Sequence, residues 1–179
     1  MPEANLKQTE AGLVPDGDGW YVINARDAPW VQRESLGSHC DFEGDVEWPH
    51  MGLNICVLEP GMPNCMYHRE SLQEGFLVIA GECRLLVEGE ERRMRRWDYF
   101  HCPPWIDHVF VGAGDSPCVI VMAGGRGAVE DEVFYPVNEL AQKYGASALE
   151  DTPHPREAYA RFTRRGPHAY PHGDLLPPG

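Results

Sequence analysis

Short apolar runs separated by turn residues fill the middle of the chain. Apolar or alternating stretches occupy residues 53–59, 76–80, 83–87, 108–111 and 118–123. Turn-forming groups such as Pro60-Gly61, Gly81-Glu82 and Glu88-Gly89-Glu90 end three of these runs. Runs of this length, bounded in this way, are typical of β-strands. The pattern therefore predicts an all-β fold, a sandwich or a barrel.

The two ends of the chain have a different character. Residues 1–19 are polar and rich in Gly and Pro, which predicts an N-terminal arm, and residues 20–24 have strand composition. In residues 128–162 we expect a helical extension: Asn138 can cap one short helix that stops at Gly145, and Pro155 can begin another that runs to Phe162. The tail, residues 163–179, is dense in Pro, Gly and His, so we expect it to lie loosely over the domain or to be disordered. The barrel domain then spans residues 20–127.

Length and charge limit the function. A chain of 179 residues is long enough for one domain with a real core. Its 15 basic and 28 acidic residues give a net charge of -13, which argues against a nucleic-acid partner, because phosphate binding requires an excess of Lys and Arg. The basic stretch at residues 92–96 could hold a substrate carboxylate. We favour a solvated strand that pairs with Glu88, Glu90 and Glu91.

The cysteines and the hydrophobic pattern bear on location. The chain has six cysteines, and it opens without the basic and apolar segments of a signal peptide, so we expect a reducing, cytoplasmic location. Cys56, Cys83 and Cys118 stand in apolar runs and are expected to be small buried hydrophobic residues. No apolar run approaches the ~20 residues that span a bilayer, so we expect no membrane association.

Four polar residues stand out against this apolar background: His68, Glu70, Glu74 and His108. His68 and Glu70 are two residues apart, so on a strand they share a face. Burying an imidazole and carboxylates at the start of an apolar segment is costly unless they are paired or coordinated. A divalent cation would satisfy all four, whereas mutual hydrogen bonds in a metal-free barrel are the simpler alternative.

The spacing of these residues resembles that of the cupin superfamily, in particular its small single-domain members of bacterial type. The first cupin motif is matched by Gly61, His68, Glu70, Glu74 and Gly81, with one extra residue before His68 and Glu70 where a second His is usual. In the second motif Pro103 and His108 match, whereas Trp97 and Trp105 replace glycines. The resemblance covers about residues 50 to 124. It implies a double-stranded β-helix, a jelly-roll barrel with the metal inside, here followed by short C-terminal helices.

The same resemblance implies a set of roles. His68, Glu74 and His108 would hold the metal, and Glu70 would be a fourth ligand or a catalytic base. Iron or manganese is favoured, and zinc is possible. The leading expectation is an enzyme with dioxygenase-type or isomerase (enolisation) chemistry on a small polar molecule. The alternatives are a non-catalytic binding or sensing module and metal-free sugar-nucleotide isomerisation. Cupins often pair an early strand with a second subunit, so we also expect a homodimer.

Residues around the four candidates carry further expectations. Strand parity aims Cys65 and Tyr67 away from the face of His68. Phe76, Leu85 and Phe110 are expected to wall the pocket from water. His39 and His50 could supplement the site, but we favour ordinary loop histidines.

Overall fold

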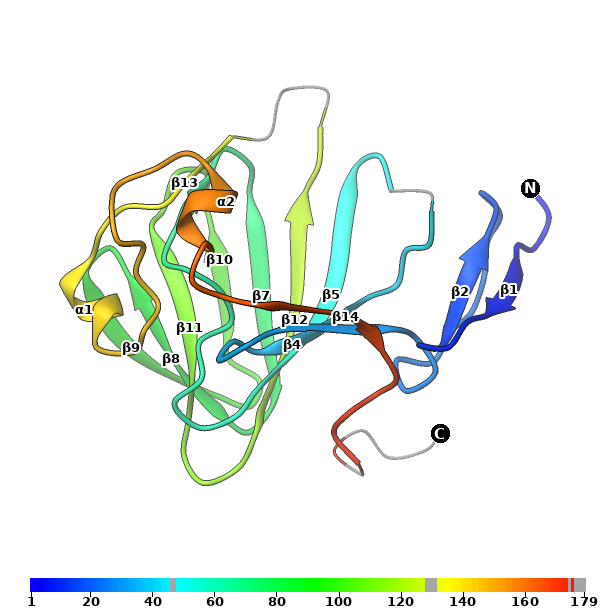
Figure 1. Ribbon diagram of the computed structural model, residues 1–179, viewed down its shortest axis with the longest axis horizontal. Coiled ribbons are helices and arrows are strands. Elements are labelled where there is room, and N and C mark those ends of the chain that lie inside the picture. Colours follow the sequence, from blue (N-terminus) through cyan, green and yellow to red (C-terminus); the bar gives the residue numbers. More distant parts are fainter. Residues whose placement is uncertain (46–47, 128–131, 174, 176–179) are drawn as a thin grey trace.

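Two antiparallel sheets face each other in the computed structural model, which describes residues 1–45, 48–127, 132–173 and 175. The larger sheet has seven strands in the order β10 (Tyr99–Cys102), β7 (Glu74–Ala80), β12 (Cys118–Gly125), β5 (Met51–Leu58), β4 (Ser38–Asp41), β3 (Trp30–Arg33) and β14 (Arg164–His168). The smaller sheet has the order β11 (His108–Ala113), β8 (Glu82–Val87) and β9 (Glu90–Arg95). Figure 1 shows this arrangement, and it confirms the all-β prediction.

The strands predicted from apolar runs are all present. Each pairs with a neighbour over most of its length; β12, for example, pairs with β5 from Cys118↔Leu58 to Gly125↔Met51. The turn between β8 and β9 has positive φ angles at Glu88 (49°) and Gly89 (78°), as in the type I′ turns that join two-stranded hairpins. The hairpin predicted there is confirmed.

The core lies between the two sheets. It is almost wholly apolar because alternate side chains of each strand point inward. Its buried members come from both sheets: Cys56, Leu58, Phe76, Val78, Cys83, Leu85, Met94, Cys102, Phe110, Cys118 and Ile120. The six cysteines are free thiols, and Cys56, Cys83 and Cys118 are buried as expected.

The basic stretch in β9 is a solvated strand, as favoured from the sequence. Only Met94 of this strand is buried, and it points into the core. Arg92 forms an ion pair with Glu90, and Arg93 forms one with Glu82. These pairs are exposed, so they contribute little to stability.

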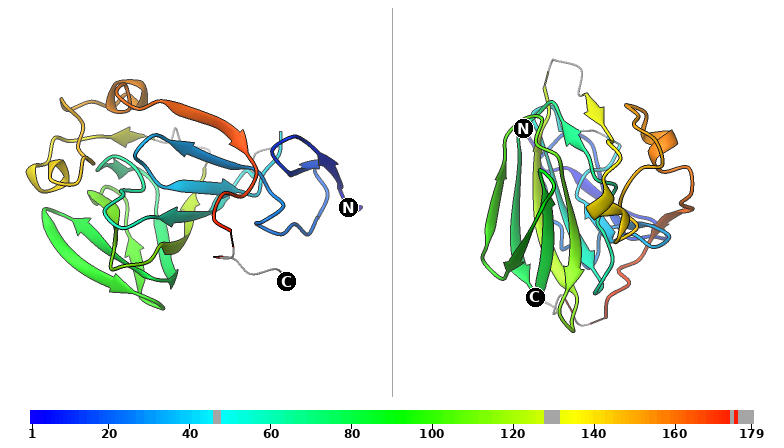
Figure 2. Two further views of the ribbon diagram at one scale, coloured as in Figure 1. Left: turned by 60° about the horizontal axis from the view of Figure 1, so that its bottom comes forward. Right: turned by 90° about the vertical axis from the view of Figure 1, so that its left-hand side faces the viewer.

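The N-terminal region differs from the prediction. Residues 20–24 form no strand, and Trp20 makes only an isolated bridge with Glu3. The strand composition there is overridden because the chain has no neighbouring strand to pair with over more than one residue. Instead, β1 (Asn5–Gln8) and β2 (Leu13–Asp16) form a hairpin at the end of the molecule away from the C-terminal helices (Figures 1 and 2). The homodimer stays a prediction.

The C-terminal extension contains two short helices. Helix α1 (Glu139–Gln142) begins at Asn138, whose side-chain Oδ1 accepts a hydrogen bond from Ala141 N at 2.9 Å. The chain then turns at Gly145, where φ is +70°. Both features confirm the sequence prediction. Helix α2 (Pro155–Ala158) starts at the predicted proline but ends four residues before Phe162.

The described part of the tail is more ordered than expected. Strand β14 pairs with β3 at the edge of the large sheet, and the Tyr170 ring packs on Trp30 with a centroid distance of 5.3 Å. The expectation of a loose tail is therefore wrong for residues 163–173. The start of the predicted extension, residues 128–131, and the end of the tail lie outside the described residues. No helix among the described residues is long and apolar enough to cross a membrane.

Candidate metal centre

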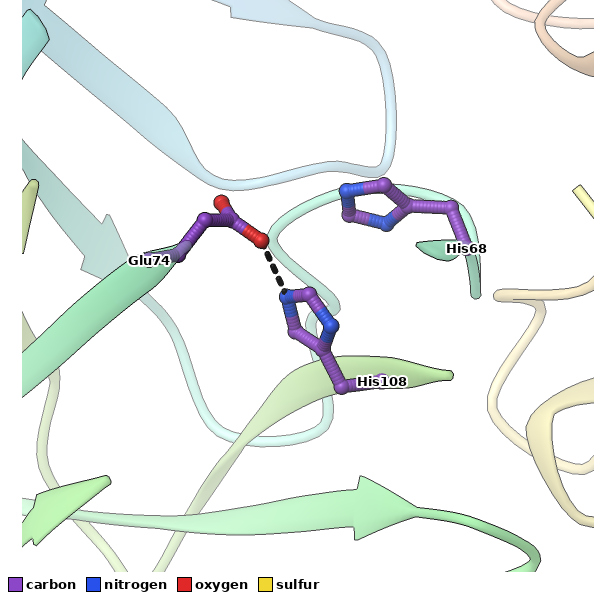
Figure 3. A group of neighbouring side chains, drawn as sticks. All are labelled: His68, Glu74 and His108. Atoms are coloured by element: carbon purple, nitrogen blue, oxygen red, sulfur yellow. Dashed lines mark ion pairs between the residues drawn. The ribbon is translucent and has the colours of Figure 1, made fainter. Parts of the chain in front are cut away.

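Three candidate ligands converge at one end of the barrel. His108 begins β11, Glu74 begins β7, and His68 immediately precedes the short strand β6 (Arg69–Glu70). His68 and His108 form an antiparallel bridge, with His108 N donating to His68 O at 2.8 Å. One ligand atom from each of His68, Glu74 and His108 lies within 4.8 Å of the others (Figure 3).

Backbone carbonyls orient both imidazoles. His68 Nδ1 lies 2.8 Å from Met66 O, and His108 Nδ1 lies 3.0 Å from Ile106 O. A carbonyl oxygen can only accept, so each Nδ1 carries the proton when the ring is neutral, and each Nε2 has a free lone pair. His68 Nε2 points to Glu70 Oε1 at 3.2 Å and His108 Nε2 to Glu74 Oε2 at 3.3 Å. The contacts between the Nδ1 atoms and the carbonyl oxygens are the arrangement that fixes metal-binding histidines in proteins.

The two imidazoles differ in electrostatics. Burial and the nearby charge of His68 together lower the pKa of His108 to about 3, so His108 is neutral at pH 7. Burial also acts to lower the pKa of His68, but Cys65 and Glu70 outweigh it and raise that pKa. His108 Nε2 is buried and makes no hydrogen bond to any described residue. Such a lone pair, beside a carboxylate and a second imidazole, fits a divalent metal ion.

Glu70 lies next to this cluster but is not one of its three members. Its Oε1 faces His68 Nε2, and its side chain is 30% exposed. Burial alone would raise the pKa of Glu70, but the hydrogen bond and charge of His68 lower it, so the carboxylate is ionised at neutral pH. Its assignment as a fourth ligand or a base stays a prediction.

A cavity of about 320 Å³ opens beside the cluster. This volume is at the lower end for small-molecule sites, so it suits a small ligand. Phe76 lines it, while Phe110 packs on Phe76 at a centroid distance of 4.7 Å and Leu85 lies in the core behind. Polar and aromatic residues make up much of the remaining wall: Arg33, His39, Asn54, Asn64, Cys65, Glu70, Arg126, Tyr135 and Tyr159.

The parity prediction is wrong for Cys65 and confirmed for Tyr67. Cys65 lines the cavity, and its sulfur lies 3.6 Å from His68 Nδ1, so the prediction that it faces away is wrong. Parity failed because residues 64–67 form no strand. Tyr67 does lie outside the cavity, but it is buried, in a cluster with Val109, Val111 and residues of the C-terminal extension.

Several residues of the cavity wall were not found from the sequence. His39 was expected to be an ordinary loop histidine, yet it lies on β4 and faces the cavity. His50 is exposed and does not line the cavity. Arg33, Tyr135 and Tyr159 come from segments with no motif, so nothing in the sequence placed them at the site.

Comparisons with known proteins agree with this architecture. Residues 54–124 match the family model described as a cupin domain. A structure of an RmlC-like cupin from Shewanella frigidimarina superposes with a TM-score of 0.52 at 13% identity, covering 62% of this chain and 94% of that one. The polyketide cyclase RemF from Streptomyces resistomycificus gives a TM-score of 0.51 at 13% identity, covering 62% and 86%.

A third structure, of a proposed sugar phosphate isomerase from Acidithiobacillus ferrooxidans, gives a TM-score of 0.50 at 22% identity. The match covers 55% of this chain and 64% of the isomerase chain, so it spans less than two thirds of that protein. No protein with a curated description matches the sequence. Residues 54–124 of this chain are thus similar to a cupin domain, and the fold is the double-stranded β-helix.

Proposed function

We propose that this cupin is a metal-dependent enzyme that transfers a proton on a small polar molecule bound in the cavity. The observation that carries the proposal is the convergence of His68, Glu74 and His108, with ligand atoms within 4.8 Å. Carbonyls hold both imidazoles at Nδ1, which leaves Nε2 of each ring as the atom that would bind a metal. Two imidazoles and a carboxylate suit iron or manganese, and zinc is also compatible.

A divalent ion held by these three residues would supply Lewis-acid polarisation of a substrate oxygen. The chain itself supplies the remaining functions. The Phe76 side chain is 3% exposed and excludes water from one wall of the cavity. Cys65 and Asn64 line the wall near the imidazoles and can position polar groups of the ligand.

Glu70 is the proposed base. It lines the cavity, it is ionised at neutral pH, and it stands beside the cluster, where it can reach a ligand. A positioned carboxylate of this kind can remove a proton from carbon next to a polarised carbonyl. The same residue can return the proton to the former carbonyl carbon, and transfer of the hydroxyl proton from one oxygen to the other then completes an isomerisation.

Dioxygenase-type chemistry is the second candidate. Two imidazoles and one carboxylate with open positions are the donor set of non-haem iron oxygenases. The cavity beside His68 and His108 provides room for further ligands. Oxygen consumption by the iron-loaded protein, with proton exchange absent, would favour this candidate over the isomerase.

The first experiment measures metal content. Tag-free wild-type protein is analysed for metals next to His68→Ala, with His101→Ala, an exposed histidine of β10, as the matched control. We expect about one equivalent of iron or manganese in the wild type and in the control, and loss of most of it in His68→Ala. A wild-type protein that cannot be loaded would contradict the proposal.

The second experiment separates catalysis from binding. Metal-loaded protein is incubated in D₂O with dihydroxyacetone, glyceraldehyde or pyruvate, and C–H exchange is followed by NMR. We expect exchange with at least one of these compounds, and Glu70→Gln should slow it by about 10²–10⁴-fold while keeping its metal. Metal and ligand binding without exchange or oxygen uptake would instead identify a non-catalytic binding cupin.

A further inference from the structure

The wall of the cavity carries a positive charge that no described carboxylate neutralises. Arg33, at the end of β3, lines the cavity and is partly buried. Its guanidinium lies over the Tyr159 ring, 4.3 Å from the centroid, and forms no ion pair with any described residue. A partly buried cation without a counter-ion is unfavourable, and here it occurs in a strongly acidic chain. Arg33 is therefore available to an anionic ligand.

Aromatic rings connect Arg33 to the candidate metal centre. The Tyr159 ring contacts Tyr135 edge-on at 5.7 Å, and Tyr135 stacks on His68 at 5.7 Å. All four residues line the same cavity. A small molecule can therefore meet Arg33 with one group and the cluster of His68, Glu74 and His108 with another. Stacking on Tyr159 also holds the guanidinium fork in one plane, which favours a planar, bidentate anion.

Two neutral polar groups complete the wall. Burial lowers the pKa of His39 to about 4, with Arg33 and Arg164 acting in the same direction, so this imidazole adds a hydrogen-bonding group without charge. Asn54 also lines the cavity, and its Oδ1 atom is buried with no hydrogen-bond partner among the described residues. An unpaired buried acceptor is costly, so a ligand that brings a donor is favoured.

We propose that the cavity takes a small hydroxycarboxylate that also bears a ketone or aldehyde: its carboxylate pairs with Arg33, its hydroxyl group donates to Asn54 Oδ1, and its carbonyl oxygen faces the cluster of His68, Glu74 and His108. This inference names the substrate class and rests on the proposed function of the same site. A single guanidinium matches the single charge of a carboxylate. A phosphate would call for further donors, and the only other arginine of the cavity, within the described chain, is Arg126, which is paired with Glu43 at 2.7 Å.

The test compares glycerate with its uncharged amide, and uses inorganic phosphate as the competing anion; none of the three carries the reacting carbonyl, so binding is measured without turnover. Glycerate, glyceramide and inorganic phosphate are titrated into full-length protein by calorimetry, both metal-free and manganese-loaded. The variants are Arg33→Gln, Arg33→Lys and, as matched control, Arg96→Gln, an exposed arginine that stacks on Trp97 outside the cavity. Circular dichroism and metal analysis accompany each variant, so that a folding defect is recognised.

We expect wild type and Arg96→Gln to bind glycerate at least tenfold more tightly than glyceramide. Arg33→Gln should reduce this ratio to about one without changing metal content, and Arg33→Lys should keep part of it. Equal affinities in the wild type, an unchanged ratio in Arg33→Gln, or tighter binding of phosphate than of glycerate would overturn the inference. Failure to load manganese would contradict the proposed function alone, because the carboxylate preference is also measured on the metal-free protein.

Discussion

At the scale of single residues, two carbonyl oxygens prepare the candidate metal centre. Met66 O and Ile106 O hold the Nδ1 atoms of His68 and His108, so the two Nε2 atoms face Glu70 and Glu74 without a metal being needed to orient the rings. Each carbonyl belongs to the residue two positions before its histidine. Glu70 contacts His68 at the other nitrogen of the ring, with Oε1 3.2 Å from Nε2.

His39 makes a separate contribution, to the pH dependence of stability. Its folded-state pKa is about 4, whereas an unfolded histidine titrates near ~6.5. Between these values the unfolded chain binds a proton that the folded protein does not, so the free energy of unfolding falls as pH falls through this window. For His39 alone we expect a loss of about 2 kcal/mol between pH 7 and pH 5.

Urea denaturation of metal-free protein at these two pH values measures this effect. His39→Gln should lose correspondingly less stability than the wild type, because glutamine does not titrate. His108, whose pKa is also lowered by burial, contributes equally to both proteins and cancels in the comparison. Equal losses in the two proteins would show that His39 is not neutral in the folded state.

At the scale of elements, the sequence was informative wherever a strand carried its own periodicity. Strands β5, β7, β8, β11 and β12 were all predicted from apolar runs and their turns. Residues 20–24 were wrongly expected to form a strand and β14 was not predicted, because strand formation there depends on whether a partner strand lies alongside, which only the tertiary structure decides. The cluster of His68, Glu74 and His108 was predicted from the spacing of these residues. The contact between Arg33 and Tyr159 was not predicted, because the two residues are 126 positions apart and belong to no motif.

The C-terminal extension covers one face of the smaller sheet. Ala141 and Ala146 pack against large side chains that point away from the core: Tyr67, Leu86, Val109 and Val111. Truncation after Gly127 would expose all four, so we expect the shortened protein to aggregate and to bind a hydrophobic dye. Light scattering and dye fluorescence measure both effects. Deletion of residues 1–8, which removes the largely exposed strand β1, is the control and should leave the protein monodisperse.

A folded, monodisperse protein ending at Gly127, with altered ligand access, would instead show that the extension only closes the cavity. The contacts favour a role in the core, because Tyr67 N also donates to Ala146 O at 2.6 Å. That hydrogen bond ties the segment before His68 to the extension. The extension therefore supports the candidate centre as well as the sheet.

At the scale of the whole molecule, the negative net charge of the protein disfavours the anionic ligand that the cavity is proposed to bind. The net charge of -13 repels anions at long range, but salt screens such effects beyond about 8 Å under physiological conditions. Within the cavity, the charges of the lining residues determine which ligand binds, and Arg33 is one of these residues. An anionic ligand is thus compatible with an acidic protein when the cation stands at the site itself.

Metal binding should also be visible in the stability of the whole protein, because an ion that binds only the folded state stabilises it by mass action. At a free manganese concentration of 100 times Kd this amounts to about 2.7 kcal/mol. For a domain of this size that corresponds to a rise in Tm of about 5–10 °C.

Thermal unfolding of the wild type, with and without manganese, measures the shift. His108→Ala removes the buried Nε2 ligand and should abolish it, whereas His101→Ala should retain it. The same shift in His108→Ala would place the ion elsewhere on this acidic surface, and the centre built on β7 and β11 would have to be given up.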